Sequence, residues 1–72
     1  MARQPDGKPP VTVDIFGQSY TVRSDDEPGV QRAAAAVDQR MQEIAQRTRT
    51  ISPIRIAVLA ALYFAYEHCK SG

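Results

Sequence analysis

The only histidine and the only cysteine of this 72-residue sequence are its most evident candidates for catalysis or metal binding. His68 and Cys69 are adjacent, and neighbouring residues on a helix point about 100° apart, so they do not form a catalytic dyad. Together they also fall short of the tetrahedral ligand set of a structural zinc site. The sequence shows no plausible Ser/His/Asp set and no glycine-rich phosphate loop. We therefore expect no enzyme, no cofactor and no metal site, with His68 on the surface and Cys69 in a core or an interface.

The acidic run from Asp25 to Glu27 is a second candidate for metal binding. It directly precedes a helical pattern, and Ser24, Asp25 and Asp26 are all favoured as helix N-caps. Acidic side chains are also favourable beside the partial positive charge of a helix N-terminus. We interpret the run as a helix start, and the sequence leaves open which of the three residues is the cap.

Nine basic and eight acidic side chains leave a net charge of +1. That balance is too neutral for a protein dedicated to nucleic acid, so a small DNA-binding dimer is the least favoured function. Residues 1–10 lack the long apolar segment of a secretory signal, and a single cysteine excludes an internal disulfide. We expect a cytoplasmic protein. Residues 1–10 hold three prolines and a glycine, which predicts a disordered tail.

The chain is organised around a helix predicted from Ser52 to about Lys70. Ser52 is a favoured cap, and Pro53 fits the first helical position, where its missing N–H costs nothing. Ile51 and Ile56 have the spacing of a hydrophobic staple, in which two apolar side chains pack together across the cap. These three signals place the start of the helix at the same point.

This helix has no charged residue from Ile56 to Tyr66 and is apolar on all sides. The eleven uncharged residues are too few to cross a bilayer, which needs about 20, so we expect no membrane insertion. A chain of this length buries only about 60% of its unfolded surface and cannot cover such a helix alone. We predict that the helix forms the core of a homodimer. The predicted interface residues are Val58, Leu59, Ala61, Leu62, Phe64, Ala65 and, from the preceding segment, Phe16.

Residues 11–23 alternate apolar and polar side chains on both sides of a glycine, which predicts a hairpin of two half-buried strands. A two-residue loop at Gly17 and Gln18 suits a type II′ turn, because glycine takes the position that needs positive φ. The resulting register pairs Ile15 with Tyr20 and Val13 with Val22 on one face.

Phe16 is the one apolar residue that this register leaves on the polar face, near the tip. Either a partner subunit covers it or it is a contact residue on the surface, and we favour the partner subunit. An isolated hairpin is only marginally stable in water, so the hairpin must pack on the helices or extend across a dimer.

A helical pattern with an alanine-rich apolar stripe also runs from Val30 to Arg47. Arg47 lies at the end of this helix, and Arg49 lies in the short link that follows. Cations complement the partial negative charge of a helix C-terminus. That explanation is adequate for one arginine and weaker for a second one in the link.

The order of a hairpin, a helix, an R-T-R link and an apolar helix with A-A-L followed by Y-E resembles the ZapA family of bacterial cell-division proteins. The resemblance covers about residues 11–68 and rests on an ordered set of residues rather than on one motif. In the hairpin these residues are Val13, Ile15, Phe16, Gly17, Ser19 and Val22. In the helices they are Val37, Asp38, Arg40, Met41, Ile44, Arg47, Thr48, Arg49, Leu59, Ala60, Ala61, Leu62, Tyr66 and Glu67.

The resemblance implies a non-enzymatic cytoplasmic protein at midcell. Such a protein binds FtsZ, the tubulin-like division GTPase, and cross-links its filaments in the Z-ring. The head domain of the family dimerises, and its basic residues are implicated in FtsZ contact; here they correspond to Arg47 and Arg49. A hairpin-tip position that is often basic in the family is Gln18 here. The alternative function is a small structural dimerisation module for another protein partner.

We therefore predict an α+β fold, a hairpin followed by two helices, with a globular head over residues 11–70. The long coiled coil that usually continues the second helix in the family is missing, because only five residues follow Glu67. Either the chain is a head-domain fragment or it is a short homologue that works as a dimer.

Overall fold

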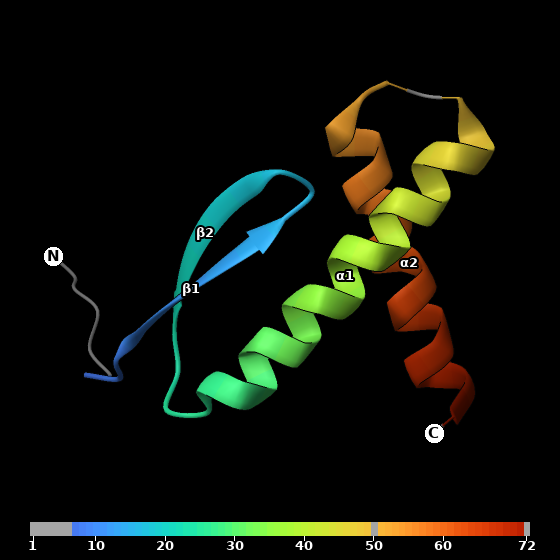
Figure 1. Ribbon diagram of the computed structural model, residues 1–72. Coiled ribbons are helices and arrows are strands. Elements are labelled where there is room, and N and C mark those ends of the chain that lie inside the picture. The colour runs from blue at the N-terminus through green and yellow to red at the C-terminus, as the bar shows by residue number, and fades with distance from the viewer. Residues whose placement is uncertain (1–6, 50, 72) are drawn as a thin grey trace, which may run out of the picture.

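The computed structural model describes residues 7–49 and 51–71, which form a β-hairpin followed by two helices. The strands are β1 (Pro10–Ile15) and β2 (Gln18–Arg23), and the helices are α1 (Glu27–Thr48) and α2 (Pro53–Ser71). The hairpin lies along the N-terminal half of α1, and α2 crosses the C-terminal half (Figure 1). The predicted α+β order is confirmed. Of the predicted tail, residues 1–6 lie outside the described residues, whereas Pro10 already begins β1.

The hairpin has the predicted apolar face but a different register. Its turn is at Phe16 and Gly17, so Tyr20 pairs with Val13 rather than with Ile15. Phe16 and Gly17 both have positive φ, 52° and 82°, as in a type I′ turn, whereas the prediction assumed a type II′ turn that began at Gly17. The same side chains still share a face, because the change moves the pairing by an even number of residues and strand alternation has a period of two.

Phe16 is held in this left-handed conformation by contacts with α1. Its backbone N–H donates a hydrogen bond of 2.6 Å to Oδ1 of Asp38. Its half-buried ring packs against the core cluster that contains Met41 and Ile44. The expectation that Phe16 is stranded on the polar face is therefore wrong. A bulky residue at positive φ persists only where the surrounding structure supports it, and here α1 supplies that support.

The core consists of two clusters along α1. Under the hairpin, Ala34 packs with Val11 and Val13 from β1, and Ile15 and Val30 lie beside them half-buried. The second cluster joins the two helices and contains Met41, Ile44, Ile56 and Ala60, with Ile15, Phe16, Val37, Ala45 and Leu59 partly buried against it. Helix α1 packs against both β1 and α2, so it positions every other element.

Helix α1 begins at a cap formed by Asp26, one of the three residues that the sequence left open. Oδ1 of Asp26 accepts a hydrogen bond of 3.2 Å from the Gly29 N–H, and the Ser24 hydroxyl accepts one of 3.0 Å from the Asp26 N–H. Gly29 approaches the Asp26 carboxylate so closely that a Cβ at this position would collide with it. The acidic run therefore starts a helix, as predicted.

Helix α2 begins at Pro53 with Ser52 as its cap, as predicted. The Ser52 hydroxyl accepts a hydrogen bond of 3.3 Å from the Arg55 N–H, and its carbonyl accepts one of 3.1 Å from the Ile56 N–H. The predicted staple is wrong, however, because Ile56 is 2% exposed in the core while Ile51 is 94% exposed. The cap forms without the apolar contact that the spacing suggested.

Candidate functional site

Helix α2 has one face inside the molecule and one face open to solvent. Its inner residues Ile56 and Ala60 are buried against α1. On the opposite side, apolar side chains follow one another at intervals of four residues: Ile54 (76% exposed), Val58 (61%), Leu62 (61%) and Tyr66 (60%). A row of this kind forms a continuous apolar stripe on the helix surface. Contiguous exposed apolar surface of this type marks interaction sites.

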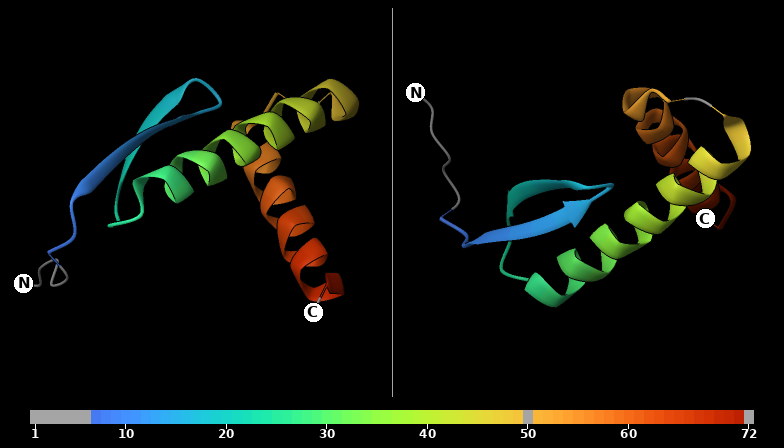
Figure 2. Two further views of the ribbon diagram at one scale, coloured as in Figure 1. Left: turned by 60° about the horizontal axis from the view of Figure 1, so that its bottom comes forward. Right: turned by 45° about the horizontal axis from the view of Figure 1, so that its top comes forward.

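An apolar groove of about 630 Å³ adjoins this stripe. Figure 2 shows the hairpin turn and the start of α2 on the same side of α1, and residues from all three elements line the groove. Its lining residues are Val13, Ile15, Phe16, Gln18, Tyr20, Val22, Val37, Met41, Pro53, Ile54 and Ala57. Ile54 belongs to both the groove and the stripe, so the two form one surface.

Strand β2 contributes to this surface because α1 packs against β1 and leaves β2 uncovered. All six residues of β2 are exposed, including Tyr20 (50%) and Val22 (43%). The prediction of two half-buried strands is therefore correct for β1 and wrong for β2. The alternation of apolar and polar residues predicted that Tyr20 and Val22 share the apolar face of the hairpin, and both side chains line the groove.

The residues predicted for a dimer interface fall into two groups. Val58, Ala61, Leu62 and Ala65 are exposed on α2. Leu59, Phe64 and Phe16 are half-buried, and all three make contacts within the chain: Leu59 and Phe16 pack on the helix–helix cluster, and the Phe64 ring lies under the Arg40 guanidinium. The side chains of the first group are therefore open to contact with a partner, whereas those of the second group are partly covered by the chain itself.

Arginine side chains gather where α1 turns into α2. Arg47 is in the last turn of α1, Arg49 is its C-cap, and Arg55 is in the first turn of α2. We call these three residues and Ile51 the basic corner. All four side chains are exposed. The sequence contains no acidic residue between Glu43 and Glu67, so the positive charge of the corner is not offset by its neighbours along the chain.

The two acidic residues that line a small pocket together with Arg47 are already paired with Arg40. Nη2 of Arg40 lies 3.0 Å from Oε2 of Glu67, and its Nε lies 3.8 Å from Oε1 of Glu43. The Arg40 guanidinium also stacks 4.8 Å from the centre of the Phe64 ring. The pocket that Arg40, Glu43 and Glu67 line with Arg47 has a volume of about 290 Å³. Arg47 forms no ion pair with a described residue, and neither does Arg49 or Arg55.

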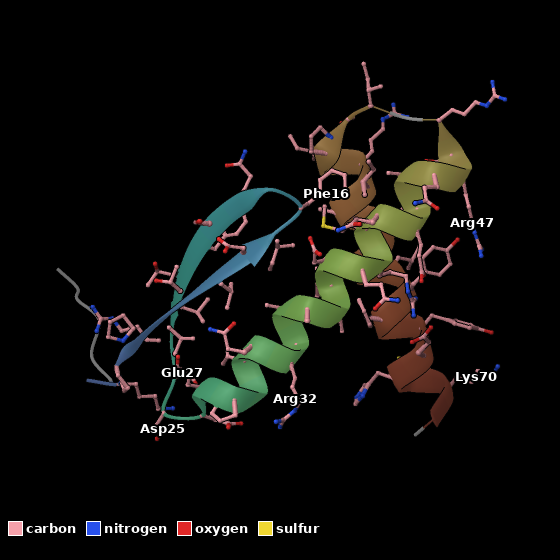
Figure 3. The ribbon with its side chains drawn as sticks, viewed as in Figure 1. Phe16, Asp25, Glu27, Arg32, Arg47 and Lys70 are labelled. Carbon is pink, nitrogen blue, oxygen red and sulfur yellow. The ribbon has the colours of Figure 1, made fainter. Side chains whose placement is uncertain are left out.

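Gln18 lies apart from the two arginines with which it was grouped. It borders the apolar groove, whereas Arg47 points away from the hairpin (Figure 3). The hairpin turn is fixed to Asp38, and Arg47 follows Asp38 by nine positions, which is about half a turn around the helix at about 100° per residue. Gln18 therefore lies at the apolar groove and not at the basic corner.

His68 and Cys69 are both exposed in the last turns of α2, so Cys69 is not a core residue of this chain. No group of three or more His, Cys, Asp or Glu side chains within residues 7–49 and 51–71 is placed to hold a metal ion. In the same part of the chain, neither helix alone is long and apolar enough to cross a membrane; only the two joined across a 115° bend meet that length and composition.

A hairpin and two helices that expose an apolar groove, an apolar stripe and a basic corner define a small α+β interaction module. The sequence matches the family model described as cell division protein ZapA over residues 11–71. The chain belongs to the ZapA family of cell division proteins, which is not a known enzyme family.

Two relatives and two solved structures illustrate this similarity. The chain is 36% identical to cell division protein ZapA of a Geobacillus species, with 83% of this chain and 70% of the relative covered. It is 31% identical to ZapA of Bacillus mycoides, with 97% and 80% covered. A ZapA mutant dimer from Geobacillus stearothermophilus superimposes with a TM-score of 0.74 at 35% identity, covering 97% of this chain and 80% of that one. A conserved bacterial protein of unknown function from Pseudomonas aeruginosa gives 0.75 at 28% identity, covering 86% and 70%.

Proposed function

We propose that this protein is a non-enzymatic adaptor of the bacterial division ring, a cytoplasmic homodimer at midcell that binds FtsZ and promotes the association of its filaments. Family membership supports a division role. The basic corner is the observation that carries FtsZ binding, because its exposed arginines have no acidic partner among the described residues. Arginine pairs with carboxylates through parallel hydrogen bonds, which suits an acidic filament surface.

The apolar groove and the α2 stripe support self-association. A two-fold dimer uses the same patch on both subunits, so each patch must contain both a ridge and a recess that fits it. The stripe of Val58, Leu62 and Tyr66 provides the ridge, and the adjoining groove provides the recess. The solved ZapA dimer, whose subunit has this fold, supports self-association. A dimer also carries two basic corners and can therefore contact two filaments at once.

Reversing charge at the corner tests the FtsZ contact. We expect Arg47→Glu with Arg49→Glu to abolish co-sedimentation with polymerised FtsZ at physiological salt, because a loss of about 1–3 kcal/mol raises the Kd about 5–150-fold. Wild-type binding should weaken as salt rises from low to physiological strength. Arg32→Glu is the matched control, since Arg32 is exposed near the start of α1, far from the corner (Figure 3).

Folding must be measured on the same preparations by circular dichroism, and the dimer by light scattering. If the arginines only complement the helix terminus, the double variant will melt at a lower temperature and will bind in proportion to its folded fraction. Undiminished co-sedimentation of a folded double variant would place the FtsZ contact elsewhere. A wild-type dimer that does not bind FtsZ at any salt would leave the structural dimerisation module as the better function.

A further inference from the structure

We infer that the basic corner is a two-part docking site, in which Ile51 makes an apolar contact and Arg47, Arg49 and Arg55 hold carboxylates around it. This inference rests on the proposed function and adds the chemistry of the bound segment. The partner presents an acidic stretch of protein that carries an apolar side chain among its carboxylates.

The exposure of Ile51 is the first observation. Its side chain is 94% exposed, although the cap beside it has the spacing for a staple with Ile56. A single exposed isoleucine is common and needs no explanation by itself. Ile51 is different because it lies between two helices and is followed within three residues by Ile54, which is 76% exposed. Ile51 and Ile54 therefore present apolar surface to solvent within a stretch of the chain that also carries three exposed arginines.

The backbone of Arg49 is the second observation. Arg49 is the C-cap of α1 and has φ 60° and ψ 9°, the left-handed conformation. Glycine is strongly preferred there, with asparagine next, because a side chain at this conformation meets the backbone. An arginine in this position reduces the stability of the helix end. The sequence therefore has an arginine at a position where the stability of the helix end favours glycine.

Arg55 is the third observation, and it also contradicts local stability. It lies in the first turn of α2, which contains no acidic residue. The free amides of a helix N-terminus carry partial positive charge, so a cation there is unfavourable. Complementing a helix dipole explains Arg47 and does not explain Arg55. Departures from local rules without a structural gain are typical of functional sites.

Charge determines which partner suits this surface. The stretch from Ile44 to Tyr66 contains three arginines and no acidic residue. Arginine forks complement carboxylates, and an apolar side chain beside Ile51 would exclude water from those pairs. An anionic membrane also attracts basic and apolar residues, but sequences of that kind usually carry about four to eight clustered Lys and Arg. The three arginines favour an acidic protein segment.

The decisive experiment measures the Kd for polymerised FtsZ by co-sedimentation at low and physiological ionic strength. We expect Ile51→Ser to raise the Kd about tenfold at both ionic strengths, because the apolar contact is not screened by salt. Ile51→Val keeps an apolar side chain and should stay within about twofold of wild type. Arg55→Ser should raise the Kd mainly at low salt and so flatten the salt dependence. Arg32→Ser is the control for loss of an exposed arginine elsewhere.

Arg49→Gly separates binding from stability. Glycine removes the left-handed strain, so the melting temperature should rise while the affinity for FtsZ falls. A variant that melts lower and binds as wild type would show that Arg49 serves the helix end, which overturns its role in docking.

The remaining outcomes separate this inference from the proposed function. If wild type binds FtsZ and the Ile51→Ser and Arg55→Ser variants bind equally well, the inference alone is overturned. If wild type does not bind, the proposed function and the inference both fail. Binding of wild type to vesicles of anionic phospholipid that is lost in Ile51→Ser would assign the corner to a membrane instead. Dissociation of the Ile51→Ser dimer in light scattering would make Ile51 an interface residue and also overturn the inference.

Discussion

Asp38 is the residue that fixes the hairpin turn to α1. Its Oδ1 accepts the Phe16 N–H at 2.6 Å, and its Oδ2 accepts a hydrogen bond of 2.8 Å from Nε2 of Gln42. The carboxylate is half-buried, and a hydrogen bond to a charged acceptor is stronger than one between neutral groups. The unusual backbone of Phe16 therefore depends on one side chain of a helix that is distant in sequence.

We expect Asp38→Ala to lower the free energy of unfolding by about 1–3 kcal/mol, because it leaves the Phe16 N–H without its acceptor. Asp38→Asn keeps an acceptor oxygen, so its free energy of unfolding should lie between that of Asp38→Ala and that of wild type. Urea denaturation followed by circular dichroism at one fixed protein concentration measures both. Asp25→Ala, an exposed carboxylate before α1, is the control and should change stability by less than about 0.5 kcal/mol. Equal effects of Asp38→Ala and Asp25→Ala would show that the hydrogen bond contributes nothing.

At the scale of single residues, the sequence predicted the features that depend on interactions between near neighbours in the chain. The cap at Ser52 and Pro53 depends on neighbours within one helical turn, so it could be read from the residues alone. Phe16 depends on Asp38, which lies 22 residues away, and its positive φ has no local sequence signal. The exposure of Ile51 was equally unpredictable, because staple spacing permits the contact without requiring it.

Among the elements, α2 has an outer face that the chain itself does not cover. Leu62 is 61% exposed there, so a charge at this position should be tolerated by the folded subunit. In a dimer that buries the stripe, the same charge would be desolvated without a partner. We therefore expect Leu62→Arg to raise the dimer Kd at least about tenfold while the helix content is retained. Size exclusion with light scattering, together with circular dichroism, measures both properties.

The matched control is Gln46→Arg, which adds the same charge at an exposed position of α1 outside the stripe. It should leave the dimer intact. A Leu62→Arg protein that remains dimeric would show that the stripe is not the interface. A wild-type protein that is a well-folded monomer at micromolar concentration would exclude the dimer altogether.

The elements themselves were largely predictable, but their pairings were not. Apolar periodicity gave both helices and the inner face of β1, because burial repeats with the geometry of each element. The same periodicity could not show that β2 is left uncovered, since alternation identifies a face and not the element that packs on it. For the candidate site, the sequence prediction grouped Arg47, Arg49 and Gln18, and the structure places the two arginines at the basic corner and Gln18 at the apolar groove. Arg55 was missed, and its position in the first turn of a helix was the available signal.

At the scale of the whole molecule, α1 is the element on which the hairpin and α2 both pack. Within residues 7–49 and 51–71 no close backbone contact joins a strand to α2, although Ile15 and Phe16 pack against the cluster that α1 forms with α2. A subunit of this architecture leaves the apolar groove open. If a second subunit fills it, part of the stability comes from association, and dilution removes that part.

We therefore expect the melting temperature to rise with protein concentration, by several degrees from low micromolar to about a hundredfold higher, as mass action requires for a folded dimer that dissociates on unfolding. Circular dichroism melts in cells of different path length measure this over the full range. The Leu62→Arg variant should show a much smaller dependence. A melting temperature that is the same at all concentrations would mean that the subunit is stable alone.

The basic corner belongs to neither core cluster, and this has a consequence for how the protein can evolve. Substitutions of Arg47, Arg49, Ile51 or Arg55 remove no buried side chain, so the fold imposes little selection on these positions. Replacing Arg49 with glycine is even expected to strengthen the helix end. Affinity for a partner can therefore drift, be lost or be redirected by single mutations at the corner. A lineage can change the partner of this protein and keep its architecture intact.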